Sequence, residues 1–201
     1  MNNFIELDAS ASGVQIACLL TGNDATAALV NLKPGPLRDI YTEILASAHL
    51  RDDLKCLDRR AIKTPSIAYV YGGGYATVET ALQNKGIYDK SATMFLNKMV
   101  GMHMRPVREV QNVFRGVVRT AANAGLTELK VPLPNGLTYT VPFRNEMKFI
   151  KQFTVRSKMI SAPDLNTNVR GVKAPTGILD LGKASRTATA GFIQSLDALI
   201  L

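Results

Sequence analysis

The sequence has few of the residues that build disulfide or metal frameworks. Its 201 residues include two cysteines, Cys18 and Cys56, and two histidines, His49 and His103. The thiols lack the spacing of metal ligands, so they predict a reducing compartment and no disulfide framework. The histidines have no ligand residues beside them in the sequence, so we expect neither to be catalytic.

Long hydrophobic runs are missing as well. The apolar stretch from Val14 to Leu20 is too short to span a bilayer. The N-terminus has the pattern of neither a secretory signal nor an Arg-rich transit peptide. We therefore expect no membrane segment and no secretion. The length suits one domain with a core, or a lobe of a larger protein.

Positive charge is what the chain has in excess. It carries 24 Lys and Arg residues against 16 Asp and Glu residues. This balance suits a polyanionic partner, although many basic domains bind none. Charge alone therefore does not choose between a nucleic-acid enzyme and a solvated basic surface.

The apolar pattern predicts a mainly helical α+β fold. A strand at residues 4–8 precedes six expected helices, at residues 12–20, 37–50, 59–71, 75–83, 91–102 and from 106 to a stop at 125. The hydrophobic period then changes from helical spacing to two, which indicates strands.

A β-hairpin is predicted near residues 129–143. Alternating apolar residues flank Asn135-Gly136, a pair typical of a type I′ turn. Beyond the hairpin, Phe153 and Val155 indicate a further strand. We expect an extended loop over residues 161–182 and mixed structure over 183–201.

The helix predicted at 59–71 carries a stripe of charged and aromatic residues. Arg59 and Lys63 are four residues apart, so both lie on one helical face. Tyr71 follows eight residues after Lys63, slightly over two turns, and Gly72 comes next. Such a face suits a triphosphate and the sugar beyond it. The alternatives are a solvated face for the cations and a buried ring for Tyr71.

Asp8 ends the predicted N-terminal strand. A carboxylate in this position, with phosphate-binding cations on a helix, suits metal-assisted phosphoryl transfer, in which Mg²⁺ takes carboxylate, phosphate and water oxygens. The alternative is that Asp8 caps the helix that follows it.

Several segments, in order along the chain, resemble the single-subunit, bacteriophage-type and mitochondrial DNA-directed RNA polymerases. The segment from Asp8 to Gln15 resembles their first palm motif, and the segment from Asp58 to Gly72 resembles their fingers-helix motif. Three further stretches agree with the family: Val30-Asn-Leu-Lys-Pro34 with Asp39-Ile-Tyr41, Leu165-Asn-Thr-Asn168, and Gly191-Phe-Ile-Gln-Ser-Leu-Asp197.

The resemblance implies the fingers subdomain of a right-hand polymerase with a palm strand at its N-terminus. Residues 1–22 would supply the palm strand and following helix, and residues 23–201 the fingers and the start of the return to the palm. The implied activity is DNA-templated RNA synthesis from ribonucleoside triphosphates by a two-metal mechanism. The implied partners are the DNA template, the RNA product and the triphosphates, in a phage-infected bacterial cytoplasm or an organellar matrix.

The resemblance also implies roles for single residues. Asp8 and the Ala9 carbonyl would bind Mg²⁺, and Arg59 and Lys63 would bind phosphates. Tyr71 and Gly72 would sense the sugar, so Asp8, Lys63 and Tyr71 form the implied catalytic set.

Two positions bear on the choice of nucleotide and template. Gly13 stands where the related DNA polymerases typically carry a glutamate that blocks a ribose 2′-hydroxyl, which favours ribonucleotides. Gln194 stands where the RNA polymerases usually carry a histidine that contacts the template–product duplex. Glutamine can still bond to a minor-groove edge.

The family's second essential aspartate, in a His-Asp-Ser motif, does not occur in the sequence. We therefore expect a partial polymerase that is inactive alone and that requires a missing palm and thumb polypeptide. Two alternatives stay open: a fragment of a family A-like DNA polymerase, and a catalytically dead nucleic-acid-binding remnant.

Overall fold

The computed structural model describes residues 11–152 and 171–200. This part of the chain is mainly helical, with two small antiparallel sheets. Its α-helices are α1 (Ser12–Thr21), α2 (Asp24–Leu29), α3 (Ile40–Ala48), α4 (Arg59–Val70), α5 (Tyr75–Gln83), α6 (Lys90–His103), α7 (Arg105–Asn123) and α8 (Leu181–Ile200). The predicted strands at residues 4–8 and near 153–155 lie outside the described residues.

Aspartate caps fix the starts of three helices on one side of the molecule. Asp39, Asp58 and Asp89 begin α3, α4 and α6, and the carboxylate of each accepts a backbone N–H from the first turn. Capping satisfies donors that the helix itself leaves unpaired. The cap at Asp39 also explains why α3 begins at Ile40 and not at the predicted residue 37.

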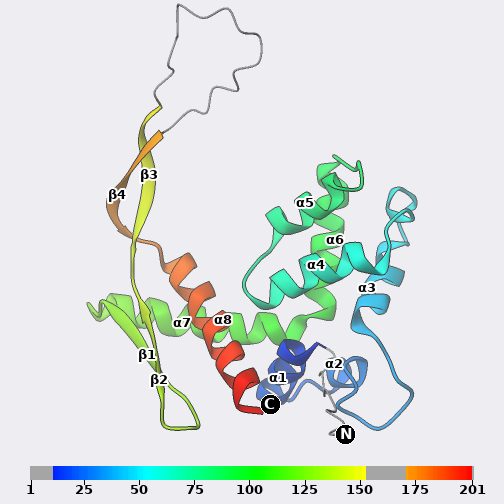
Figure 1. The fold of residues 1–201 in the computed structure, drawn as a ribbon, viewed down its shortest axis with the longest axis horizontal. Coiled ribbons are helices and arrows are strands. Elements are labelled where there is room, and N and C mark those ends of the chain that lie inside the picture. The colour runs from blue at the N-terminus through cyan, green and yellow to red at the C-terminus, as the bar shows by residue number, and fades with distance from the viewer. Residues whose placement is uncertain (1–10, 153–170, 201) are drawn as a thin grey trace, which may run out of the picture.

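One hydrophobic core connects the helices. The apolar face of α7 buries Val107, Val110, Phe114 and Val118, and this helix packs against α1 and α8. The ring centres of Phe114 and Phe192 lie 5.3 Å apart, and this contact joins α7 to α8. Figure 1 shows α3 to α6 grouped on one side of the molecule, while α8 crosses α7 on the other side. The site described below lies between these two groups.

The hairpin predicted near 129–143 is confirmed. Strands β1 (Glu128–Pro132) and β2 (Thr138–Pro142) pair antiparallel. The predicted type I′ turn is wrong, because Gly136 alone in the loop has a positive φ, of 80°. The Leu133 N–H donates to the Leu137 carbonyl, which leaves a three-residue loop of Pro134, Asn135 and Gly136. The Gly136 N–H donates to the Leu133 carbonyl at 3.0 Å, so the turn spans Leu133 to Gly136 and is not centred on Asn135 and Gly136. Pro134 stands at its second position, where the fixed negative φ of proline is favoured.

The extended loop predicted over 161–182 is wrong where the structure describes it. Residues Gly171–Leu179 form β4, which pairs antiparallel with β3 (Asn145–Gln152). This second hairpin projects away from the helices (Figure 1). The pairing joins segments that are distant in the sequence, so no local turn signal marks it.

The mixed structure predicted over 183–201 is also wrong, because α8 is a helix of 20 residues. Its buried face consists largely of small residues such as Ala184, Ser185, Ala188 and Thr189. The Ser185 and Thr189 hydroxyls donate to carbonyls four residues earlier, at 2.6 and 3.0 Å. Polar groups that are satisfied within the helix can be buried, so the face lacks the hydrophobic period that would predict it.

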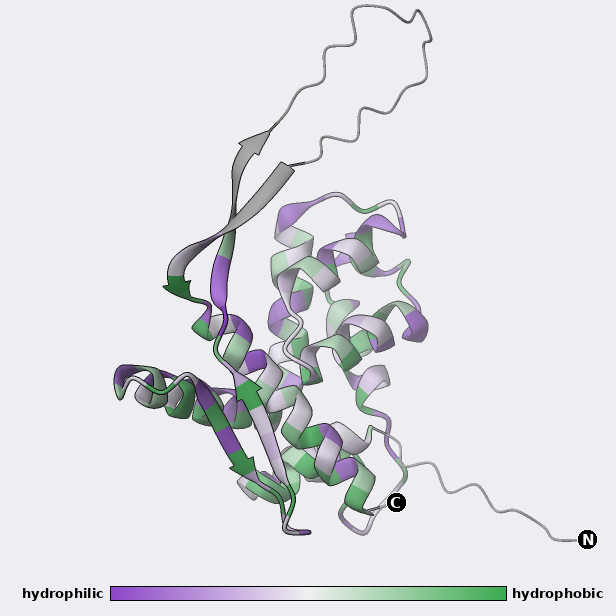
Figure 2. Ribbon diagram, turned by 60° about the vertical axis from the view of Figure 1, so that its left-hand side comes forward, coloured by the Kyte–Doolittle hydropathy of each residue, from purple (hydrophilic) through white to green (hydrophobic). Residues whose placement is uncertain are grey.

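Each helix combines hydrophilic and hydrophobic stretches (Figure 2). In the described part of the chain, no helix has the length and apolar character needed to cross a membrane.

Candidate functional site

Helix α4 ends in a glycine motif that places Tyr71 at the edge of a cavity. The Gly73 N–H donates to the Ala68 carbonyl at 2.7 Å, and the Gly72 N–H donates to the Tyr69 carbonyl at 3.1 Å. Gly72 has a φ of +82°. These two bonds with a left-handed glycine form a Schellman motif, which ends a helix sharply. Tyr71 is therefore the C-cap residue, and its side chain is 37% exposed rather than buried.

A cavity of about 310 Å³ lies beside α4 and brings together most of the predicted substrate residues. Gly13 from α1 and Arg59, Lys63 and Tyr71 from α4 all line it. The predicted ligands Asp8 and Ala9 lie outside the described residues, so their position relative to this cavity is not described. Tyr41 of α3, to which we assigned no role from the sequence, completes the wall beside Arg59.

Arg59 is held in place by two contacts. Its Nε donates to Asp39 Oδ2 at 2.5 Å, and its guanidinium carbon lies 5.3 Å from the centre of the Tyr41 ring. Burial raises the pKa of Asp39, but hydrogen bonds from Arg59 and Thr42 and the charge of Arg59 bring the pKa below its ordinary value. The bond to Asp39 engages Nε, so the outer guanidinium nitrogens remain for a ligand.

Lys63 has no such restraint. Its side chain is exposed, and it makes no ion pair with any residue that the structure describes. The two cations of the cavity therefore differ, since Arg59 is fixed by a carboxylate and Lys63 is free to neutralise an anion.

Gly72 lies against α8 as well as ending α4. A Cβ at this position would come within 2.7 Å of Arg186 Cγ, so the aliphatic part of Arg186 packs directly on the glycine. Arg186 and Tyr71 then line a second cavity of about 440 Å³ together with Gln194. Tyr71 therefore belongs to both cavities. Arg186 was missed by the sequence reasoning because the helix that carries it was not predicted.

Gly13 is buried and lines the first cavity. Close packing also explains why this residue is a glycine. A Cβ there would come within 2.7 Å of Val70 Cγ1 and 3.4 Å of Ile193 Cγ2. The glycine therefore allows α1 to lie close to the end of α4 and to α8. The expectation of ribonucleotides at this position thus rests on the resemblance proposed from the sequence motifs and not on free space at the glycine.

Gln194 is exposed on α8 and separate from the first cavity. The two histidines have contacts of their own, as His49 Nε2 lies 3.1 Å from the Leu57 carbonyl and His103 Nε2 lies 2.9 Å from Ser47 Oγ. Neither histidine lines the cavities described above.

The described lining of the first cavity supplies cations, hydroxyls and backbone, and no carboxylate. Within residues 11–152 and 171–200, no three His, Cys, Asp or Glu side chains are grouped so that they could bind a metal ion. The carboxylate of Asp39 is bonded to Arg59, which lines the cavity. These residues therefore do not fit Mg²⁺ by themselves.

No protein-family model matches the chain, and a search of curated proteins finds no match.

Proposed function

We propose that the chain is the fingers part of a single-subunit DNA-directed RNA polymerase and that the cavity beside α4 binds a ribonucleoside triphosphate. The observation that supports this most is the gathering of Gly13, Arg59, Lys63 and Tyr71 around one cavity. Gly13 comes from a different helix and lies 46 positions before Arg59. Helical spacing alone could not have brought it there.

The cations would bind the phosphates at the N-terminal part of α4. Lys63 supplies an ammonium that forms no ion pair with the residues that the structure describes, and Arg59 supplies its outer nitrogens from a fixed position. Charge-assisted hydrogen bonds of this kind are about twice as strong as neutral ones. Tyr71 lies eight residues on, about 12 Å along the helix axis, where it can contact the sugar of the same extended ligand.

The proposed reaction is attack of a 3′-hydroxyl on the α-phosphate, with release of pyrophosphate. The part of the proposal that concerns Mg²⁺ rests on Asp8 and Ala9 alone. A partner polypeptide would supply the second aspartate and the thumb, so the chain alone would bind triphosphate without synthesising RNA.

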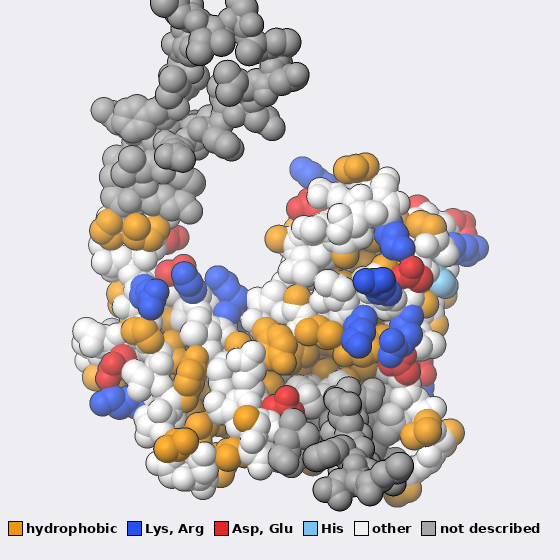
Figure 3. Space-filling view, viewed as in Figure 1, with side chains coloured by type: hydrophobic (Ala, Val, Ile, Leu, Met, Phe, Trp, Pro, Cys, Tyr) orange, Lys and Arg blue, Asp and Glu red, His pale blue; other side chains and the backbone are white. Residues whose placement is uncertain are grey.

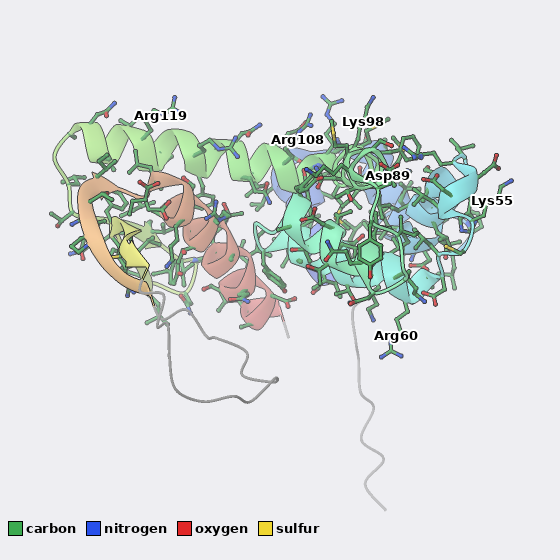
Figure 4. The ribbon with its side chains drawn as sticks, turned by 90° about the horizontal axis from the view of Figure 1, so that it is seen from above. Lys55, Arg60, Asp89, Lys98, Arg108 and Arg119 are labelled. Atoms are coloured by element: carbon green, nitrogen blue, oxygen red, sulfur yellow. The ribbon has the colours of Figure 1, made fainter. Side chains whose placement is uncertain are left out.

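The proposal is tested by triphosphate binding to the full chain, measured by calorimetric titration with ATP. Lys63→Met should weaken ATP binding by about tenfold or more, because a charged hydrogen bond contributes roughly 1.5–3 kcal/mol. Lys98→Met removes the same charge from α6, on the side of the molecule that Arg108 and Arg119 share (Figure 4). It should leave binding unchanged.

Two results would contradict the proposal: no ATP binding by the unaltered chain, or equal losses in the two lysine variants. Titration with dATP distinguishes an RNA polymerase fragment from a DNA polymerase fragment. Tighter binding of dATP than of ATP would favour the DNA polymerase fragment. Binding of nucleic acid without either nucleotide would favour a catalytically dead binding module.

A further inference from the structure

Helix α7 has an apolar surface that the described part of the chain leaves uncovered. Val113 of this helix is 64% exposed, and Leu126, shortly after its end, is 53% exposed. They belong to a surface groove of about 550 Å³, which we call the α7 groove. Its exposed lining residues are Val113, Gly116, Val117, Thr120, Ala124 and Leu126.

Gly116 in this groove has no neighbour in the described chain that explains why it is a glycine. Gly13 of α1 and Gly191 of α8 each face a side chain that an added Cβ would meet at 2.7 Å or less. Nothing lies within 4 Å of a Cβ built at Gly116, although glycine weakens a helix interior relative to alanine. Close approach of another molecule would account for it.

The α7 groove has the shape that receives another helix. Gly116, Thr120 and Ala124 follow one another at intervals of four residues and form a shallow row along α7. Val113 and Val117, also four residues apart, form a ridge beside this row. Ridges at this interval on one helix pack into such rows on another, with the axes crossing at about −50°. The row extends over about 12 Å, which is roughly two helical turns.

The carboxylates on the elements that carry the groove are offset by cations. Glu109, in the turn of α7 before the groove, pairs with Arg105 at 2.8 Å. Glu128 of β1, shortly after the helix, pairs with Lys130 at 3.4 Å. Neither carboxylate therefore leaves a net negative charge beside the groove.

An unneutralised arginine lies at the edge of the groove. Arg119 is three residues after Gly116, so the two are neighbours on the helix surface. It forms no ion pair with any residue that the structure describes. Helix α7 as a whole has four arginines and one glutamate, and the chain carries a net charge of +8. The groove is therefore apolar with a positive edge.

We infer that the α7 groove docks an amphipathic helix of an acidic partner protein. The partner would insert a ridge of apolar side chains and would place a carboxylate beside Arg119. Amphipathic helices bind apolar grooves in this way, and complementary charge at the edge selects the partner. A second copy of this chain would bring arginine against arginine, which like-charge repulsion disfavours.

The inference does not depend on the proposed triphosphate site. Lys and Arg side chains gather on both sides of the hollow between α4 and α8 (Figure 3). Lys63 lines the cavity on the α4 side, and Lys183 and Arg186 line the second cavity on the α8 side. The α7 groove shares no lining residue with either cavity.

The test measures binding of a fluorescent synthetic helix to the full chain by anisotropy. The acidic probe is a peptide of about 18 residues with leucines at i, i+4 and i+7 and glutamates beside them. Its twin carries lysine at every glutamate position. The acidic probe should bind saturably in 0.15 M NaCl, and the lysine twin should bind about tenfold more weakly.

Filling the groove should remove the binding. Gly116→Leu should weaken binding of the acidic probe by about tenfold or more, because the leucine occupies the row that receives the partner. The matched control Ala76→Leu adds a leucine at an exposed position of α5 and should bind as the unaltered chain does. Urea denaturation should show Gly116→Leu to be at least as stable as the unaltered chain. If it is unfolded, Val113→Gln should weaken the acidic probe by about threefold or more.

Reversing the charge at the edge should exchange the preference between probes. Arg119→Glu should weaken the acidic probe by about fivefold and strengthen the lysine twin by a similar factor. Arg108→Glu makes the same change on the same side of α7 (Figure 4) but lies five residues before the groove begins. It should alter the binding of either probe by about twofold or less.

Three results would overturn the inference: no saturable binding of the acidic probe, equal binding of the two probes, or equal effects of Gly116→Leu and Ala76→Leu. Sedimentation of the unaltered chain tests the second copy. A dimer that Gly116→Leu makes monomeric would assign the groove to self-association and refute the acidic partner. ATP affinity should be the same in Gly116→Leu and the unaltered chain, so the failure of either proposal is seen separately.

Discussion

The two sides of the hollow differ in how they fix a cation. On α4, Arg59 is held by a carboxylate and an aromatic ring, through its 2.5 Å bond to Asp39 and its position over Tyr41. On α8, Arg186 is held by shape, because its stem packs on the bare backbone of Gly72. The first arrangement depends on charge and the second on the absence of a side chain. Substitutions can therefore disturb one side without the other.

The largest effect should come from filling the space beside α8. Gly191→Ala places a methyl group within the Tyr139 ring, and the overpacking should lower the free energy of unfolding by about 3 kcal/mol. Gly116→Ala is the matched control, because it lies in α7 with nothing within 4 Å of its Cβ position. It should raise stability by about 0.5–1 kcal/mol.

Urea denaturation of the two alanine variants measures this difference directly. Opposite signs for the same substitution in two helices would establish that contact with β2 requires the glycine in α8. Equal effects would show that α8 does not lie against Tyr139 as described.

A somewhat smaller effect is expected where α4 meets α8. Gly72→Ala forces an L-residue into a left-handed conformation, which costs roughly 1–2 kcal/mol, and also pushes its Cβ against Arg186. Gly22→Ala has the same kind of positive φ, +65°, with no atom within 4 Å. Denaturation should show that Gly72→Ala costs about 1 kcal/mol more than Gly22→Ala.

The comparison of Gly72→Ala with Gly22→Ala also tests the contact between Gly72 and Arg186. If the two glycine variants lose the same stability, the loss comes from the backbone alone, and Arg186 is not packed on Gly72. In that case the α8 side would have no shape-based restraint on its arginine.

The same contrast explains what the sequence could predict. Helix α4 carries its signals locally: a capping aspartate, cations four residues apart and glycines at the end, and the prediction of 59–71 differs from the observed Arg59–Val70 by one residue. The candidate set Arg59, Lys63 and Tyr71 follows from that helix. Gly13 was added to this set by the family resemblance and not by local spacing, and the structure places it beside the same cavity.

Helix α8 carries no comparable signal. Its buried alanine, serine and threonine residues leave no hydrophobic period, and its role depends on contacts with Gly72 and Tyr139, which are distant in the sequence. The pairing of β3 with β4 was not predicted for the same reason, because it joins segments that are distant in the sequence. Lys183 and Arg186 could not be singled out before the fold placed them beside Tyr71.

On the α4 side, the restraint on Arg59 can be separated into a cap and an ion pair. Asp39→Ala removes the cap of α3 and the bond to Arg59 together and should cost about 1–2 kcal/mol. Asp39→Asn keeps an oxygen for capping but loses the charge. It should cost less than about 1 kcal/mol, because the ion pair is partly exposed to solvent.

Salt separates the two contributions. The stability difference between the unaltered chain and Asp39→Asn should shrink in 1 M NaCl, where charges are screened over about 3 Å. The difference between the asparagine and alanine variants should not change. An ion-pair contribution that is insensitive to salt would contradict the charge-based restraint assigned to α4.

The smallest effect concerns pH and should also be confined to the α4 side. His103 of α6 contacts Ser47 of α3, and burial lowers its pKa below the ordinary value, against a smaller opposite effect of Glu43. The unfolded chain therefore binds a proton at higher pH than the folded chain does. Stability should be fully present above about pH 6.5 and should fall as the pH drops below that value. Urea midpoints between pH 7.5 and 5.5 should show this slope, and His103→Gln should reduce it. If His103→Gln leaves the slope unchanged, protonation of His103 is not the cause of the loss of stability at low pH.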